Sequence, residues 1–121
     1  MRVSRAADAP EGPFEADTFS GPVTRRDHGP IEAPEGSVLV VRFPAGVRTH
    51  WHSHPTGQVL YVVEGRGRVC TRDGRVEEIG SGDVVYAPPG EEHWHGASES
   101  DGVAHLALSF GATAWQEPVD G

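Results

Sequence analysis

The sequence contains a single cysteine, Cys70, among its 121 residues, so no disulfide bond can form within the chain. A lone cysteine in a strand-like run is typical of a packing residue, and the reducing cytoplasm is the compartment that we expect. Long hydrophobic runs are also missing, since none approaches the roughly 20 apolar residues of a membrane-spanning helix. Residues 1–10 have no apolar segment of the kind found in signal peptides, so we expect no export signal.

Positive charge is scarce in this chain. Only 10 lysine and arginine residues accompany 18 aspartate and glutamate residues, which gives a formal net charge of -8. Because this charge would repel the phosphates of nucleic acids and of anionic membranes, we expect neither as a partner. The sequence also has no sustained 3.6-residue hydrophobic period and no internal repeat, which argues against helical and solenoid folds.

Glycine and proline, in contrast, are frequent: 16 glycines and 10 prolines separate short runs that are rich in β-branched residues. Such runs are predicted strands, and they cover residues 18–24, 38–43, 48–54, 58–63, 83–87 and 103–110, whereas residues 25–30 are predicted as a loop. Asp73-Gly74 lies between two further short runs and predicts a hairpin turn. The pattern indicates an all-β fold, a sandwich or a barrel. We expect residues 1–16 to form a flexible arm and residues 17–121 to form one domain.

The histidines are concentrated in two short segments. His50, His52 and His54 alternate, and Gln58 follows after a turn; His93 and His95 alternate in the second segment. Residues two apart in a strand point to the same side, so each segment would present its imidazoles together. Several imidazoles close together favour a borderline divalent metal, because without one each would need another partner. The sequence therefore predicts a metal site.

These segments resemble the two motifs of the cupin family, over residues 36–111. The first motif is matched by Gly46, His52-Ser53-His54, Gln58 and Gly65, and the second by Gly82, Pro88-Pro89-Gly90 and His93. The resemblance implies a single-domain jelly-roll barrel, a homodimer, and a metal held by His52, His54, Gln58 and His93. Two positions depart from the motifs, since Gln58 replaces the usual glutamate and Ala97 stands where asparagine is usual.

A narrower resemblance concerns residues 48–58, 91–96 and 105–108, which look like small bacterial manganese cupins that include (R)-selective hydroxynitrile lyases. This resemblance implies manganese as the ion, although iron, zinc, nickel and copper also suit the ligands. Because an amide, unlike the usual carboxylate, adds no negative charge, Gln58 should leave more positive charge on the ion for an anion, unless glutamine is simply a tolerated replacement. Because ligating imidazoles are neutral, we expect the metal to leave below roughly pH 5–6, near the ordinary histidine pKa.

His105 lies on the same side of its predicted strand as Val103, Ala107 and Ser109, where small neighbours leave room for a pocket. We interpret it as the catalytic acid or base, with His95 and His50 as further candidates that could instead support the metal ligands. The expected activity is that of a lyase acting on a small molecule, in the manner of a hydroxynitrile lyase. A metal-dependent dioxygenase and a non-catalytic cupin that binds a small ligand are the alternatives.

Overall fold

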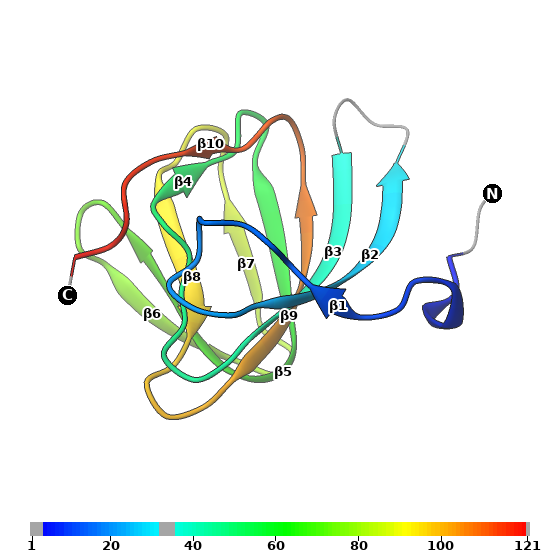
Figure 1. Cartoon of the computed structure of the whole chain (residues 1–121). Helices are drawn as coiled ribbons and strands as arrows, with labels where there is room; N and C mark the ends of the chain where they lie inside the picture. Colours follow the sequence, from blue (N-terminus) through cyan, green and yellow to red (C-terminus); the bar gives the residue numbers. More distant parts are fainter. Residues whose placement is uncertain (1–3, 32–35, 121) are drawn as a thin grey trace.

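The computed structural model describes residues 4–31 and 36–120, and its regular secondary structure is almost wholly β-strand (Figure 1). In chain order the strands are β1 (Gly12–Pro13), β2 (Thr24–Ile31), β3 (Gly36–Phe43), β4 (His52–Ser53), β5 (Gln58–Thr71), β6 (Val76–Gly80), β7 (Val84–Ala87), β8 (His93–Ala97), β9 (Val103–Ser109) and β10 (Ala114–Trp115). The one helical element in the described residues is a 3₁₀ turn, η1 (Ala6–Asp8). The predicted all-β fold class is confirmed.

The described strands form one curled sheet in the order β1-β2-β3-β9-β5-β8-β4-β10, and β6 and β7 also pair with β5. All of these pairs are antiparallel. The first part of β5 pairs with β7 and β9, and its last part pairs with β6 and β8. The long strand β5 therefore joins the two walls of a jelly-roll barrel.

The length of β5 differs from the prediction, which ended this strand at residue 63. The strand continues to Thr71 through a register shift between Val62 and Glu64 and through Gly65, whose φ is +85°. A Cβ atom on Gly65 would lie 2.1 Å from the carbonyl oxygen of Gly102. Only glycine fits this backbone conformation and this contact. The glycine that predicted the end of a strand instead marks a bend within it.

Three other predictions about strands were wrong. Residues 25–30, predicted as a loop, belong to β2, and residues 18–24, predicted as a strand, contribute only an isolated bridge at Phe19 and the first residue of β2, Thr24. Residues 48–54 contain only the short β4 and an isolated bridge at each of Arg48 and Thr49. In β2 the charged side chains find partners outside the core, since Arg26 donates hydrogen bonds to the carbonyl oxygens of Ala6 and Ala9. Charge in a sequence therefore does not exclude a strand with one solvated face.

The segment predicted as a flexible arm contains η1 and β1, and β1 pairs with β2. Just beyond β1, the ring of Phe14 lies 5.1 Å from that of Phe19, and both rings pack against the buried core. The flexibility of residues 1–16 stays a prediction.

The core fills the interior of the barrel, and it has an apolar part and a polar part. The apolar part consists of Val23, Val41, Phe43, Val62, Ile79, Ala97 and Val103. The polar part is made by buried histidines, Gln58, Thr49 and Ser109. On β9, the buried side chains of His105, Ala107 and Ser109 alternate with the less buried Leu106 and Leu108. The interior face of the sheet thus carries the chemical groups.

Candidate metal centre

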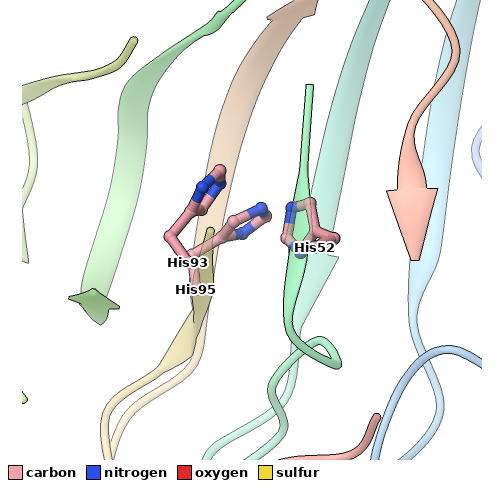
Figure 2. Close-up of side chains that lie close together, drawn as sticks. All are labelled: His52, His93 and His95. Carbon is pink, nitrogen blue, oxygen red and sulfur yellow. The ribbon is translucent and has the colours of Figure 1, made fainter. Parts of the chain in front are cut away.

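Three buried histidines from two strands converge inside the barrel. His52 lies on β4, and His93 and His95 lie on β8, which pairs with β4 through His52 and His93. One nitrogen from each imidazole lies within 4.8 Å of the other two, and Figure 2 shows the three rings turned toward one another. The predicted alternation brings His93 and His95 to the same side of β8, as expected for a strand. These three histidines are positioned to bind a metal ion.

Backbone carbonyl groups fix the orientation of two of these rings. The Nδ1 of His52 donates a hydrogen bond to the carbonyl oxygen of His50 at 2.9 Å, and the Nδ1 of His93 donates to that of Glu91 at 3.0 Å. A neutral imidazole carries one N–H group, so the Nε2 atom of each ring is left with a free lone pair. A histidine held in this way is ready to ligate a metal through Nε2.

Gln58 adds an oxygen atom to the cluster. Its Nε2 donates a hydrogen bond to the Oγ of Ser109 at 2.9 Å, which turns the amide oxygen toward His93. That oxygen lies 3.1 Å from the Nε2 of His93. Because the Nε2 of His93 carries a lone pair and the amide oxygen is an acceptor, the two atoms cannot share a proton. A cation bound between them would satisfy both.

His54 supplies another unsatisfied atom. Its ring lies 5.1 Å from that of His52, centroid to centroid, and its side chain is buried. The Nδ1 of His54 lies 3.3 Å from the Oγ1 of Thr113, whereas its Nε2 is buried with no hydrogen-bond partner in the described structure. A buried nitrogen without a partner is costly. The donor set therefore fits a divalent metal ion.

His95 connects the cluster to His105. The Nδ1 of His95 lies 3.1 Å from the Nε2 of His105, and both rings are buried. The Nδ1 of His105 is also buried and has no hydrogen-bond partner among the described residues. If the Nε2 of His105 carries the proton and donates it to the Nδ1 of His95, the Nδ1 of His105 keeps a lone pair and the proton of the His95 ring lies on its Nε2. The protonated atoms of the two rings are therefore coupled.

A small cavity of about 100 Å³ lies against these side chains. His52, His54, Gln58, His95 and His105 line one part of it. Apolar rings line the remainder, among them Phe14, Phe19, Phe43 and Trp115. A cavity of mostly apolar walls with a few convergent polar groups is typical of a site for a small ligand.

Burial keeps the imidazoles neutral. It lowers the pKa of His52 to about 3, with the neighbouring His93 adding to the effect, and it lowers the pKa of His54 to about 4. The pKa of His105 is likewise lowered by burial to about 4, and that of His95 lies well below its usual value. Because only neutral imidazole can ligate a metal, all of these rings are in the ligating state at neutral pH.

The structure brings six of the seven predicted site residues together: His52, His54, Gln58, His93, His95 and His105. The remaining one is His50, whose contribution in the described structure is its carbonyl group, which orients His52. The sequence did not point to Thr49 or Thr113, although their hydroxyl groups lie beside His52 and His54. Ser109 could have been found, since it shares the inward face of its strand with His105.

A model of the cupin domain matches residues 39–110. This chain belongs to the cupin family. The matched residues include both histidine motifs. In the described residues, no helix is long and apolar enough to cross a membrane.

Among known proteins, this cupin is similar to the (R)-mandelonitrile lyase of Granulicella tundricola, with 40% identity over 124 residues that cover 100% of this chain and 88% of the other. It also resembles a cupin-like protein of Thermotoga maritima, with 35% identity, a TM-score of 0.83 and coverage of 89% and 86%. The polyketide cyclase RemF of Streptomyces resistomycificus has 20% identity, a TM-score of 0.78 and coverage of 100% and 87%, and it shares the fold.

The lowered pKa values change the expected acid sensitivity of the site. The expectation that the metal leaves near pH 5–6 assumes the ordinary histidine pKa. In the folded protein, protons compete with the metal for the imidazole nitrogens only near the lowered pKa values, about 3 for His52 and about 4 for His54. We therefore expect bound metal to be retained at about pH 5 and lost below roughly pH 4. Metal analysis after gel filtration at a series of pH values measures this. Complete release by about pH 5.5 from a folded protein would contradict it.

The same shifts predict how the stability of the metal-free protein depends on pH. The histidines of the unfolded chain take up protons below about pH 6.5, whereas the buried ones do so only near pH 3–4. The free energy of unfolding should therefore fall steadily as the pH drops from about 6.5 toward 4. Thermal melting of the protein in chelator measures this, and a Tm that stays constant over that range would show that the histidines titrate normally.

Proposed function

We propose that this cupin is a metal-dependent lyase resembling hydroxynitrile lyases, which cleaves or forms the bond between a hydroxyl-bearing carbon and cyanide. The observation that carries the proposal is that His105, a group suited to proton transfer, lines the same cavity as the metal-ready histidines. The identity to an (R)-mandelonitrile lyase over the full chain supports the same conclusion.

The proposed metal ligands are His52, His54, Gln58 and His93, with manganese as the ion. The buried Nε2 of His54, the lone pairs of His52 and His93 and the oriented oxygen of Gln58 all support this set. His95 lies close enough to ligate, but when its Nδ1 accepts a hydrogen bond from His105 its Nε2 carries the ring proton, so we assign it to the proton-transfer pair. When bound, the ion would supply a Lewis-acidic centre that attracts an anion such as cyanide.

The residues of the chain account for the proton. In cleavage, a base removes the proton of the cyanohydrin hydroxyl group, the carbonyl double bond forms, and the carbon–carbon bond breaks with its electron pair leaving as cyanide. In the reverse reaction, the addition of cyanide to the carbonyl carbon, the same group donates a proton to the developing alkoxide. His105 is the proposed base, because it lines the cavity, its buried Nδ1 has no hydrogen-bond partner in the described structure, and its Nε2 faces His95. His95 and His50 are the other candidates for this role.

The apolar walls of the cavity would exclude water from the hydroxyl group and the base. Phe43 packs against the ring of His105 with a centroid distance of 5.3 Å, and Trp115 lies 4.6 Å from the ring of His52. With little water present, the imidazole of His105 stays neutral and accepts a proton from the substrate instead of from solvent. We also propose, from the sequence, a cytoplasmic homodimer.

The first prediction here concerns the metal ligands. The His52→Ala variant should lose most of its metal. The imidazole of His52 belongs both to the proposed ligand set and to the cluster of His52, His93 and His95. The His54→Ala variant should lose metal to a similar degree, whereas His95→Ala should retain it. Elemental analysis of the purified proteins measures metal per chain. Loss of metal in His95→Ala together with full occupancy in His54→Ala would reassign the ligands.

A second prediction concerns the neutrality of Gln58. The Gln58→Glu variant should keep its metal, since a carboxylate can accept a hydrogen bond from the hydroxyl group of Ser109. It should bind anions more weakly, because the added negative charge opposes them, by roughly tenfold or more. Spectroscopic titration of the loaded protein with azide or cyanide measures the dissociation constant. Equal affinity in both proteins would mean that the neutral amide has no role in anion binding.

A third prediction concerns the reaction itself. Manganese-loaded protein should cleave mandelonitrile to benzaldehyde and cyanide at the same rate with and without oxygen. His105→Ala should keep its metal and lose on the order of 10²–10⁴-fold in rate, the usual effect of removing a positioned proton-transfer group. A loaded wild-type protein without activity above background would refute the lyase. A His105→Ala variant of normal rate would instead move the proton role to His95 or His50.

A further inference from the structure

The cavity beside the metal centre is small for an aromatic substrate. Its volume is about 100 Å³, whereas an apolar cavity of about 150 Å³ is one that takes up benzene. Mandelonitrile carries a benzene ring together with a carbon that bears a hydroxyl group and a nitrile group, so it needs more room than benzene. Lactonitrile has a methyl group in place of that ring. The cavity therefore suits a short aliphatic hydroxynitrile, and an aromatic one fits only if a wall gives way.

The apolar walls of the cavity differ in how firmly they are held. Val41 and Phe43 belong to the buried core of the barrel, with exposed fractions of 5% and 1%. Phe14 and Phe19 are partly buried and pack against that core. Trp115, in contrast, has an exposed fraction of 42% and is the one lining residue that is exposed, all of the lining residues being described by the structure. Its indole therefore separates the cavity from solvent.

The backbone holds Trp115 directly over the metal centre. Strand β10, at the end of the sheet, pairs with β4 and places Trp115 opposite His52 (Figure 1). The two rings lie 4.6 Å apart, centroid to centroid. Next to this pair, the amide of Gln116 donates a hydrogen bond to the carbonyl oxygen of Trp51, and the amide of Trp51 donates to that of Glu117. The backbone is thus fixed on both sides of Trp51, and the exposed indole is the part that can turn.

We infer that Trp115 determines the size of the substrate. With its indole over His52, the cavity takes a short aliphatic side chain beside the reacting carbon; with the indole turned toward solvent, it takes an aromatic ring. Exposed side chains change rotamer within picoseconds to nanoseconds, so this movement does not limit turnover. An aromatic substrate binds only to the fraction of molecules whose indole is turned out, and its apparent affinity is reduced by that fraction. The inference rests on the proposed function, since it concerns the substrate of the same site.

Steady-state kinetics with mandelonitrile and lactonitrile test the inference on the manganese-loaded protein. The two substrates differ only in the phenyl or methyl group that would occupy the apolar part of the cavity. Trp115→Ala should raise the ratio of kcat/KM for mandelonitrile to that for lactonitrile by roughly tenfold or more, because it removes a limit on size in an apolar pocket. Trp115→Phe should raise the ratio less, since a phenyl ring is smaller than an indole. An effect of either variant that acts equally on both substrates cancels in the ratio.

Trp51→Ala is the matched control. It also removes an indole from a segment that pairs with the C-terminal residues, but Trp51 does not line the cavity. Its ring packs instead against Arg72, whose guanidinium carbon lies 4.1 Å from the ring centroid. The substrate ratio of Trp51→Ala should equal that of wild type. A rise as large as that of Trp115→Ala would contradict a specific role for Trp115. Circular dichroism and metal per chain verify that the variants are folded and loaded.

Binding of benzyl alcohol provides a measurement that needs no turnover. This molecule carries the ring and a hydroxyl group but has no cyanide to release, and calorimetry should show that Trp115→Ala binds it roughly tenfold more tightly than wild type does. If wild type cleaves neither hydroxynitrile, the lyase is refuted, whereas tighter binding by Trp115→Ala still supports the size limit. An unchanged affinity in a folded, loaded Trp115→Ala protein would overturn the inference. If Trp115→Ala does not fold, the same comparison with Trp115→Phe decides.

Discussion

The arrangement of donor atoms inside the barrel depends on how each buried imidazole is oriented. His52 and His93 are oriented in the same way, since each donates its Nδ1 proton to the carbonyl oxygen of the residue two positions earlier. A local backbone bond thus sets the free lone pair of each ring, independently of any distant part of the fold. Burial then keeps the rings neutral. The pairing of β4 with β8 then places the two oriented rings next to each other.

The remaining donors are held by distant contacts, and the strand β5 governs most of them. Gln58 begins this strand, opposite Ser109 on one side and Ala87 on the other, and Thr71 ends it opposite His93. One continuous strand therefore runs from Gln58 to the residue that pairs with His93. Gly65 bends this strand between the part that pairs with β9 and the part that pairs with β8.

Features that depend on residues close together in the sequence could be predicted from the sequence. The alternation of His93 with His95 on β8, and the turn at Asp73-Gly74, follow from strand and hairpin geometry alone. The confirmed all-β class followed from the spacing of turns. Such reasoning also placed His105 on an inward face, which the structure shows buried beside His95.

Features that depend on contacts between residues far apart in the sequence could not be predicted from short-range patterns. The charged segment 25–30 is a strand because its backbone pairs with that of β3. The carbonyl oxygens of Ala6 and Ala9 accept hydrogen bonds from the side chain of Arg26. Gly65 bends a strand instead of ending it because Gly102 lies against it. The hydroxyl of Thr113 reaches His54 only after the chain has returned to the barrel. The pH at which we expect metal release shifts for the same reason, since the burial that lowers the histidine pKa values is a property of the whole fold.

The walls of the cavity come from segments that lie on both sides of the metal-binding motifs in the sequence. Phe14 and Phe19 precede the first motif, and Trp115, on β10, follows the second and pairs with β4 through His52. The cavity therefore closes only when both flanking segments have packed against the strands that carry the histidines, so part of the shielding of these imidazoles from water comes from residues outside both motifs.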